Sequence, residues 1–144
     1  MRLHTLLQSL AGLGMAVAAC TAFAGASDDA ERHIRAIAAH DIDTLMAGYA
    51  DGATMLWVGG PLDGTYNGPA QLRELWAKFA KAQGPLEVAI AQVQENGNPK
   101  GATVVANARY RGANQTKVRQ VVVFRDGKIV SEVWQIDPAM PFQN

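Results

Sequence analysis

The sequence predicts an α+β domain in which three helices in the first half of the chain pack on one face of a curved antiparallel sheet. After residue 27, the first half contains three stretches with the i, i+3, i+4 spacing of amphipathic helices. The second half contains four runs rich in β-forming residues, joined by turns short enough to connect antiparallel strands. Helices that precede a series of hairpins are typical of an α+β arrangement.

Length and composition limit the chain to one ordinary globular domain. It has 144 residues, of which 49% are hydrophobic and 18% charged. The chain is therefore too short for a two-domain dehydrogenase, a kinase or an α/β barrel, yet apolar enough to bury a core. Its 13 basic and 13 acidic residues cancel. This balance gives no indication of a polyanionic partner, and we expect no nucleic-acid binding.

The first 26 residues are expected to be a secretory signal peptide. Arg2 precedes an uncharged stretch over residues 5–26, which ends in two small-x-small patterns at residues 22–24 and 24–26. We therefore expect export to the periplasm or secretion, with cleavage near Ala24 or Ala26. An uncleaved membrane anchor is the less favoured alternative, because polar residues and glycines leave the apolar run short for a spanning helix.

Cys20 leaves a second form of export open. The sequence Val17-Ala-Ala-Cys20 resembles a bacterial lipoprotein box, in which Cys20 would become the lipidated first residue of a membrane-tethered protein. We expect no membrane association unless this lipidation occurs. Cys20 is the only cysteine in the sequence, so the domain has no internal disulfide and no thiol nucleophile.

The helices are expected at residues 28–39, 42–50 and from Pro69 to the Gly84-Pro85 break. Ser27 is the expected N-cap of the first helix and Asp41 that of the second. Pro69 suits the first turn of the third helix.

The strands are expected at residues 53–58, 86–94, 102–111, 117–125 and 128–137. The turns around residues 59–68 leave room for one more short strand at residues 65–66. The folded domain is thus expected over residues 27–138, followed by a tail at residues 139–144.

Three segments resemble the nuclear transport factor 2-like superfamily, in particular its SnoaL-like and ketosteroid isomerase-like branch. They are the two helices and first strand at residues 33–55, the Gly-started helix at residues 66–79 and the last hairpin at residues 124–130. The resemblance covers residues 28–138 and implies a cone-shaped sheet behind the helices. Because this fold is shared by isomerases, dehydratases, cyclases, epoxide hydrolases and binding proteins, it does not define the chemistry.

The residues do not support ketosteroid isomerase chemistry. Those enzymes use a base aspartate and an oxyanion hole of a tyrosine and a protonated aspartate. By the resemblance, these three positions are occupied here by Trp57, His33 and a residue near Gln120. None of them matches, so we do not expect that apparatus.

The register of the last hairpin decides where Glu132 points. A two-residue Asp126-Gly127 turn would place Glu132 beside Val121 on the basic outer face. A three-residue loop with a bulge at Gly127 would pair Gln120 with Glu132 and keep residues 130, 134 and 136 together on the core face. We expect the second register because it buries the apolar side chains.

Glu132 is the leading candidate catalytic residue, with His33 beside it. A carboxylate in an apolar interior is expected to have a raised pKa and to act as a general acid or base. A structural hydrogen bond to Gln120 is the competing interpretation. The expected ligand-binding residues are Trp57, Trp76, Gln120, Trp134 and Tyr49.

Several other chemistries find no support. The chain has no Gly-x-Ser-x-Gly motif and no phosphate-binding loop. No acidic cluster accompanies the histidines, so we expect no metal site and no cofactor.

We therefore expect an exported small-molecule-binding domain with an apolar pocket for a small hydrophobic ligand. A cofactor-free lyase or isomerase using Glu132 with His33 or Gln120 is one alternative, and a protein-interaction or accessory module is another. We also expect a homodimer formed through the outer face of the sheet, where valines at positions 105, 121, 123 and 133 interrupt the basic residues.

Overall fold

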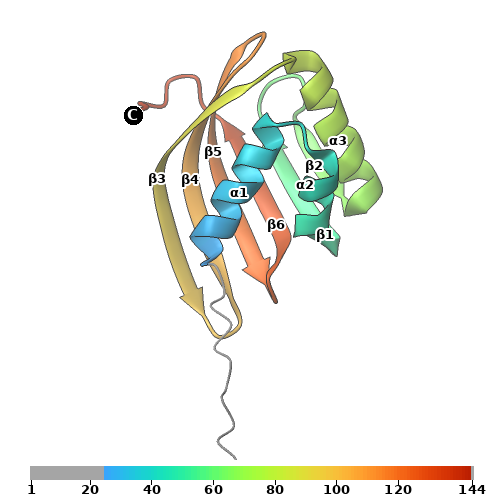
Figure 1. Cartoon of the computed structure of the whole chain (residues 1–144), viewed down its shortest axis with the longest axis vertical. Coiled ribbons are helices and arrows are strands. Elements are labelled where there is room, and N and C mark those ends of the chain that lie inside the picture. Colours follow the sequence, from blue (N-terminus) through green and yellow to red (C-terminus); the bar gives the residue numbers. More distant parts are fainter. Residues whose placement is uncertain (1–24, 144) are drawn as a thin grey trace, which may run out of the picture.

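The structure is a computed structural model that describes residues 25–143, and it confirms the α+β prediction (Figure 1). Most of the expected signal peptide, including Cys20, lies outside the described residues. The helices are α1 (Ala26–Ala38), α2 (Ile42–Gly48) and α3 (Gly68–Gln83). The strands are β1 (Tyr49–Val58), β2 (Gly64–Asn67), β3 (Glu87–Asn98), β4 (Gly101–Arg111), β5 (Gln115–Arg125) and β6 (Lys128–Ile136).

The six strands form one sheet in the order β2-β1-β6-β5-β4-β3. The short strand that the sequence left open is therefore present as β2. The β1–β6 pair is parallel and the other pairs are antiparallel, so the expectation of a wholly antiparallel sheet was wrong at this pair. The difference arises because β1 inserts between its hairpin partner β2 and the last strand of the chain.

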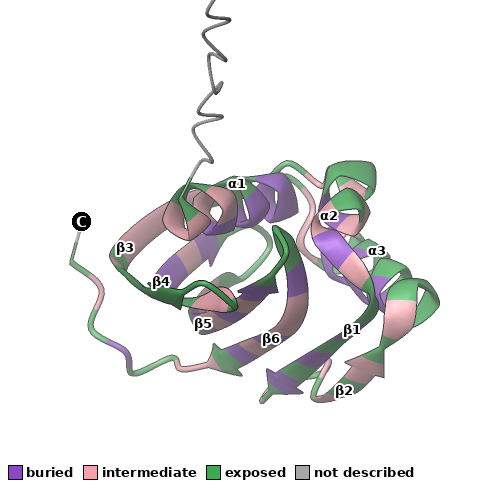
Figure 2. Cartoon of the chain, turned by 90° about the horizontal axis from the view of Figure 1, so that it is seen from below, coloured by how far each residue is buried: buried purple, intermediate pink, exposed green. Residues whose placement is uncertain are grey.

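The three helices lie on one side of the sheet, as Figure 2 shows, and the sheet curves around them. Helix α1 contacts β3 and β4, whereas α3 contacts β1 and β2. None of the helices in the described part of the chain has the length and apolar character needed to cross a bilayer.

The helix starts follow the predicted capping chemistry at α2 but not at α1. Asp41 caps α2, because its side chain accepts a hydrogen bond from the backbone N–H of Thr44 at 3.1 Å. At α1 the N-cap is Gly25 rather than Ser27. Ser27 lies inside the helix, and its N–H and hydroxyl both donate to the Glu95 carboxylate of β3, at 2.8 and 2.7 Å. A tertiary contact therefore replaces the local cap.

The last hairpin combines a two-residue turn with a bulge, so the predicted three-residue loop was wrong. Arg125 pairs with Lys128 across Asp126 and Gly127, which have φ values of 50° and 72° as a type I′ turn requires. The bulge lies at Val130, because Phe124 pairs with Ile129 and Val123 with Ser131.

The bulge sets which β6 side chains point inward. It places both Ile129 and Glu132 on the inner face, with 1% and 0% of their surface exposed. Glu132 is thus buried as expected, but it pairs with Val122, while Gln120 pairs with Trp134. Val130 is only half-buried, although it was predicted to lie on the core face with residues 134 and 136.

Candidate functional site

Glu132 is a buried carboxylate that accepts four hydrogen bonds. Its Oε1 atom accepts from Gln120 Nε2 at 3.2 Å and from Trp134 Nε1 at 2.8 Å. Its Oε2 atom accepts from the Tyr49 hydroxyl at 2.5 Å and lies 3.0 Å from His33 Nε2. An ionised carboxylate has about four acceptor positions, and protein donors occupy all of them here.

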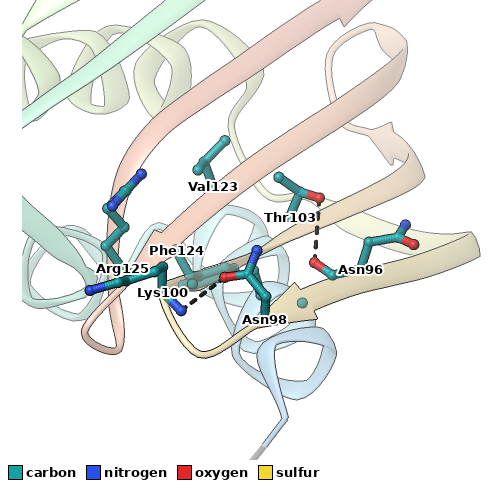
Figure 3. A pocket seen from close by; sticks show the side chains of 10 residues that line it. Asn96, Asn98, Lys100, Thr103, Val123, Phe124 and Arg125 are labelled. Carbon is teal, nitrogen blue, oxygen red and sulfur yellow. Dashed lines mark hydrogen bonds between the residues drawn. The ribbon is translucent and has the colours of Figure 1, made fainter.

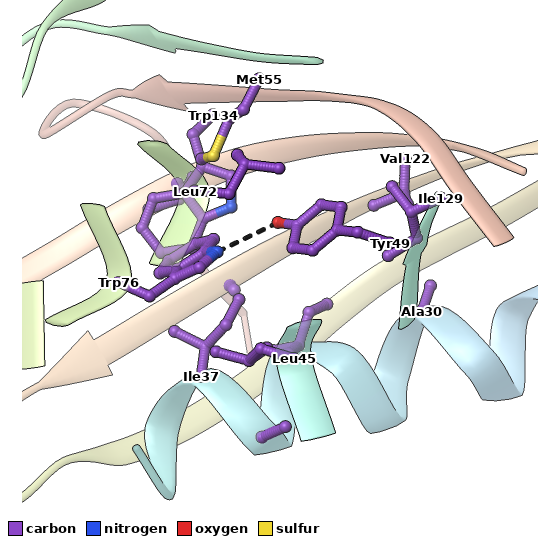
Figure 4. Close-up of a cluster of buried hydrophobic side chains, with 14 of the residues drawn as sticks. Ala30, Ile37, Leu45, Tyr49, Met55, Leu72, Trp76, Val122, Ile129 and Trp134 are labelled. Atoms are coloured by element: carbon purple, nitrogen blue, oxygen red, sulfur yellow. Dashed lines mark hydrogen bonds between the residues drawn. The ribbon is translucent and has the colours of Figure 1, made fainter. Parts of the chain in front are cut away.

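Two further side chains extend this network. Trp76 Nε1 donates to the Tyr49 hydroxyl at 3.1 Å (Figure 4), and the Tyr110 hydroxyl donates to Gln120 Oε1 at 2.9 Å. Tyr49 and Gln120 thus each donate to Glu132 and accept from a neighbour. We call the set the Glu132 network; its members are His33, Tyr49, Trp76, Tyr110, Gln120, Glu132 and Trp134.

Each member of the Glu132 network occupies an inward-facing position of the helix or strand that carries it. His33 lies on the buried stripe of α1, next to Ile34, and only 6% of its surface is exposed. Tyr49 is the first residue of β1, so its ring turns inward where α2 ends. One helix over residues 42–50 was expected, whereas the helix ends at Gly48 and the chain changes direction at Tyr49.

The pKa of Glu132 is lowered, whereas the sequence analysis expected it to be raised. Burial by itself pushes the pKa upward. The positive charge of a protonated His33 and the hydrogen bonds from His33, Tyr49 and Gln120 act in the opposite direction and prevail. The hydrogen bonds remain when the His33 ring is neutral. Glu132 therefore stays ionised inside the core.

Tyr49 remains a hydrogen-bond donor for the complementary reason. Burial, followed by the nearby charge of Glu132, raises the pKa of the Tyr49 hydroxyl well above its ordinary value. The same two causes raise the pKa of Tyr110. Both hydroxyls are therefore protonated, and each offers its proton to an acceptor of the network.

An ionised Glu132 defines the roles of the two ring nitrogens of His33. A carboxylate can only accept, so the Nε2 atom that faces it must carry a proton. In the neutral imidazole, the lone pair then lies on Nδ1. This is the arrangement of a base that is oriented by a third group.

The predicted ligand walls Trp57, Trp76 and Trp134 pack against one another in the interior. The Trp57 and Trp134 ring centroids are 4.6 Å apart, and those of Trp76 and Trp134 are 5.1 Å apart. Tyr110 stacks on Trp134 at 5.2 Å, and Phe79 also contacts it. Trp57 does not join the Glu132 network, because its Nε1 donates to the Gly59 carbonyl at 2.9 Å.

A hollow of 230 Å³ lies beside His33, between α1, α2 and the β5–β6 turn. His33 therefore belongs both to the buried network and to the wall of a hollow. The other lining residues are Asp29, Arg32, Thr44, Ala47, Gly48, Phe124, Gly127, Lys128 and Ile129.

Two other hollows lie at the β3–β4 hairpin. One has a volume of 310 Å³ and polar walls that include Asn96, Asn98 and Lys100 (Figure 3). A wider one of 680 Å³ adjoins it, next to the start of α1. Neither is lined by a member of the Glu132 network. Within residues 25–143, no group of three or more His, Cys, Asp or Glu side chains is arranged to hold a metal ion.

The model of the SnoaL-like domain family matches residues 30–132. The chain belongs to the SnoaL-like domain family. No curated protein sequence matches it.

Solved structures with the nuclear transport factor 2-like fold resemble this SnoaL-like domain. A nuclear transport factor 2-like protein of unknown function from Pseudomonas putida is 20% identical, with a TM-score of 0.64, 82% of this chain and 88% of that chain being covered. A SnoaL-like protein of unknown function from Burkholderia thailandensis is 23% identical, with a TM-score of 0.61 and coverage of 77% and 93%. These likenesses establish the fold.

A third structure has been described as a putative calcium/calmodulin-dependent protein kinase II association domain, from Xanthomonas campestris. It is 15% identical to this chain, with a TM-score of 0.65 and coverage of 85% of this chain and 95% of that chain. Proteins with different printed descriptions thus share the fold of this SnoaL-like domain.

Every member of the Glu132 network except Tyr110 was predicted as a site residue, whereas the hollow beside His33 was not predicted. Tyr110 follows the inward parity of β4, which identified it as a core residue only. Thr44, Ala47 and Gly48 line the hollow because α2 ends at Gly48, and no sequence motif indicated this end.

We expect the substitution Glu132→Gln to destabilise the SnoaL-like domain. The amide nitrogen would face two of the donors that Glu132 now accepts from, and buried donors would lose their partners. The free energy of unfolding should fall by about 3 kcal/mol, measured by urea unfolding followed by circular dichroism. The exposed Glu87 of β3 provides the matched control, since Glu87→Gln should leave the unfolding curve unchanged. Equal stability of the two variants would contradict this account.

The pKa of Glu132 also predicts how stability depends on pH. Because this pKa is lower in the folded chain than the unfolded value of about 4.3, the carboxylate stabilises the fold above that value, and the contribution is lost as the pH falls below it. The stability difference between wild type and Glu132→Gln should therefore shrink as the pH falls from 5 to 3, roughly the range below the unfolded pKa. Exposed carboxylates with lowered pKa values, such as Asp41 and Glu95, are present in both proteins and cancel. A difference that grows on acidification would overturn the prediction.

Proposed function

We propose that this SnoaL-like domain binds a small molecule in the hollow beside His33, and that His33 acts on it as a general base oriented by Glu132. The observation that supports the proposal is the double position of His33. Its Nε2 lies 3.0 Å from the buried carboxylate, and its side chain also lines the hollow.

The roles differ from those expected from the sequence. Glu132 is surrounded by four donors and has a lowered pKa, so it is a poor base and serves as a positioning residue. Gln120 is likewise occupied at both ends of its amide. Of these residues, His33 is the one that can contact a ligand.

The proposed chemistry needs no cofactor. The Nδ1 lone pair of neutral His33 removes a proton from a carbon next to a carbonyl group, and the electron pair of the broken C–H bond moves into the enolate. The ionised Glu132 stabilises the imidazolium that forms. Return of the proton to another atom gives an isomerase, and loss of a leaving group from the enolate gives a lyase.

The hollow favours a small ligand with an apolar body. Its 230 Å³ lies below the roughly 300–1,000 Å³ of pockets that hold drug-sized ligands. Ala47, Phe124 and Ile129 supply apolar walls, while Arg32 and Lys128 supply polar groups. A small cyclic carbonyl compound fits these properties.

We expect the protein to accelerate deuterium uptake at the α-carbons of cyclohexanone in heavy water, followed by proton NMR. The substitution His33→Gln should lower the accelerated rate by about 100-fold or more. Gly48→Leu should also abolish it, because Gly48 lines the hollow and a Cβ there would lie 4.0 Å from Ile129 Cδ1, so the longer side chain would reduce the space for a ligand.

Gly52→Leu is the matched control for Gly48→Leu. A Cβ at Gly52 would meet nothing within 4 Å, and Gly52 does not line the hollow, so the exchange rate should stay that of the wild type. An exchange rate that is unaffected by both His33→Gln and Gly48→Leu would remove the proposed function.

We also propose that the chain is exported and cleaved at the start of α1. What supports this is the position of the candidate cleavage sites directly before a helix that begins at Ala26. Intact-mass measurement of the protein purified from the periplasm of a bacterial host should give an N-terminus between Gly25 and Ser27. A diacylated protein that begins at Cys20 would contradict this and favour the tethered lipoprotein.

We further propose that the domain forms a homodimer through the outer face of the sheet. Four aliphatic residues align there across neighbouring strands, and we call them the aliphatic row: Leu56, Val133, Val121 and Val105. Leu56 is 44% exposed, which is unusual for a large apolar side chain. Sedimentation should show a dimer at micromolar concentrations, and Val121→Glu should convert it to a monomer. Unchanged sedimentation of Val121→Glu would contradict a dimer formed on this face.

A further inference from the structure

The C-terminal segment crosses the outer face of the sheet, the face that also carries the aliphatic row. After β6, the backbone N–H of Asp137 donates to the Lys117 carbonyl at 3.0 Å. Lys117 Nζ then donates to the carbonyls of Pro138 and Met140 at 3.3 and 2.9 Å. Figure 2 shows this segment on the side of the sheet opposite to the helices. We call residues 137–143 the strap.

The strap is packed against the sheet. Only 6% of the Met140 surface is exposed, although Met140 is not part of the core cluster between the sheet and the helices. The Arg109 guanidinium lies 4.5 Å from the centre of the Phe142 ring, a cation–π contact. Arg109 and Lys117 are cross-strand partners on β4 and β5, so the strap spans both strands.

The strap occupies surface that a sheet-face dimer needs. Along β5, Lys117 is four residues from Val121, and along β4, Arg109 is four residues from Val105, a distance of about 13 Å in each case. The aliphatic row itself spans four strands, or about 15 Å. A stable interface buries about 800 Å² on each partner. A compact footprint of that area, centred on the aliphatic row, has a radius of about 16 Å and therefore reaches the strap.

We propose that the strap competes with a second copy of the chain for the outer face of the sheet, an inference that rests on the proposed homodimer. With the strap in place, a second copy contacts only the part of the face around the aliphatic row. With the strap removed, the surface around Arg109 and Lys117 becomes available, and self-association becomes tighter.

The test compares self-association of the full chain and of a chain that ends at Asp137, by analytical ultracentrifugation. This truncation keeps the hydrogen bond from the Asp137 backbone to Lys117. We expect the dissociation constant of self-association to fall at least roughly tenfold. The double substitution Met140→Ser and Phe142→Ser is the second variant, since it weakens strap packing at constant length and should act in the same direction. Thermal unfolding confirms that each variant is folded.

Val121→Glu in both backgrounds separates the two proposals. Tighter association of the truncated chain that Val121→Glu abolishes supports the strap, even if the full chain is a monomer. Association of the full chain that Val121→Glu abolishes, but that truncation leaves equal or weakens, overturns the strap and keeps the dimer. Monomers in all four proteins overturn both proposals.

Discussion

The structure depends on keeping one ionised carboxylate hydrogen-bonded inside an apolar core. Moving a charge from water into a protein interior costs several kcal/mol even after relaxation, unless donors replace the lost water. The Glu132 network supplies four donors from α1, β1, β5 and β6, and Trp76 of α3 supports one of them. The four elements that supply these donors are therefore held in one relative arrangement, because displacing any of them removes a hydrogen bond from the buried charge.

The same constraint connects the fold to its proposed chemistry. A neutral side chain at position 132 would satisfy some of the donors but would not fix a proton on Nε2 of His33. The charge of Glu132 leaves neutral His33 with its lone pair on Nδ1, and the His33 side chain also lines the hollow in which we propose that a ligand binds. Stability and the candidate reactivity thus have a common physical origin in the charge of Glu132.

Much of this arrangement could be predicted from the sequence, because helical spacing and strand parity depend only on local periodicity. The inward faces of β4 and β5 and the burial of Glu132 follow from that periodicity. The bulge at Val130 does not follow from that periodicity, because Ile129 and Val130 are both apolar and either of them could lie on the inner face. The sign of the Glu132 pKa shift also could not be predicted, since it depends on His33 and Tyr49, which lie 99 and 83 residues away in the chain. The burial of Glu132 and its neighbours Gln120 and His33 could be predicted, but the hydrogen bonds from Tyr49 and Trp134 that complete the compensation could not.

The most direct test of the central claim is the tautomeric state of His33, measured from the ¹⁵N chemical shifts of its ring nitrogens above the pH at which the ring is neutral. If Glu132 is ionised and orients His33, Nε2 will show the shift of a protonated nitrogen and Nδ1 that of a nitrogen with a lone pair. In Glu132→Gln, where the acceptor is no longer charged, His33 should show a mixture of the two tautomers or the opposite tautomer. A proton on Nδ1 in the wild-type protein would contradict the account, because Glu132 would then not accept a hydrogen bond from neutral His33.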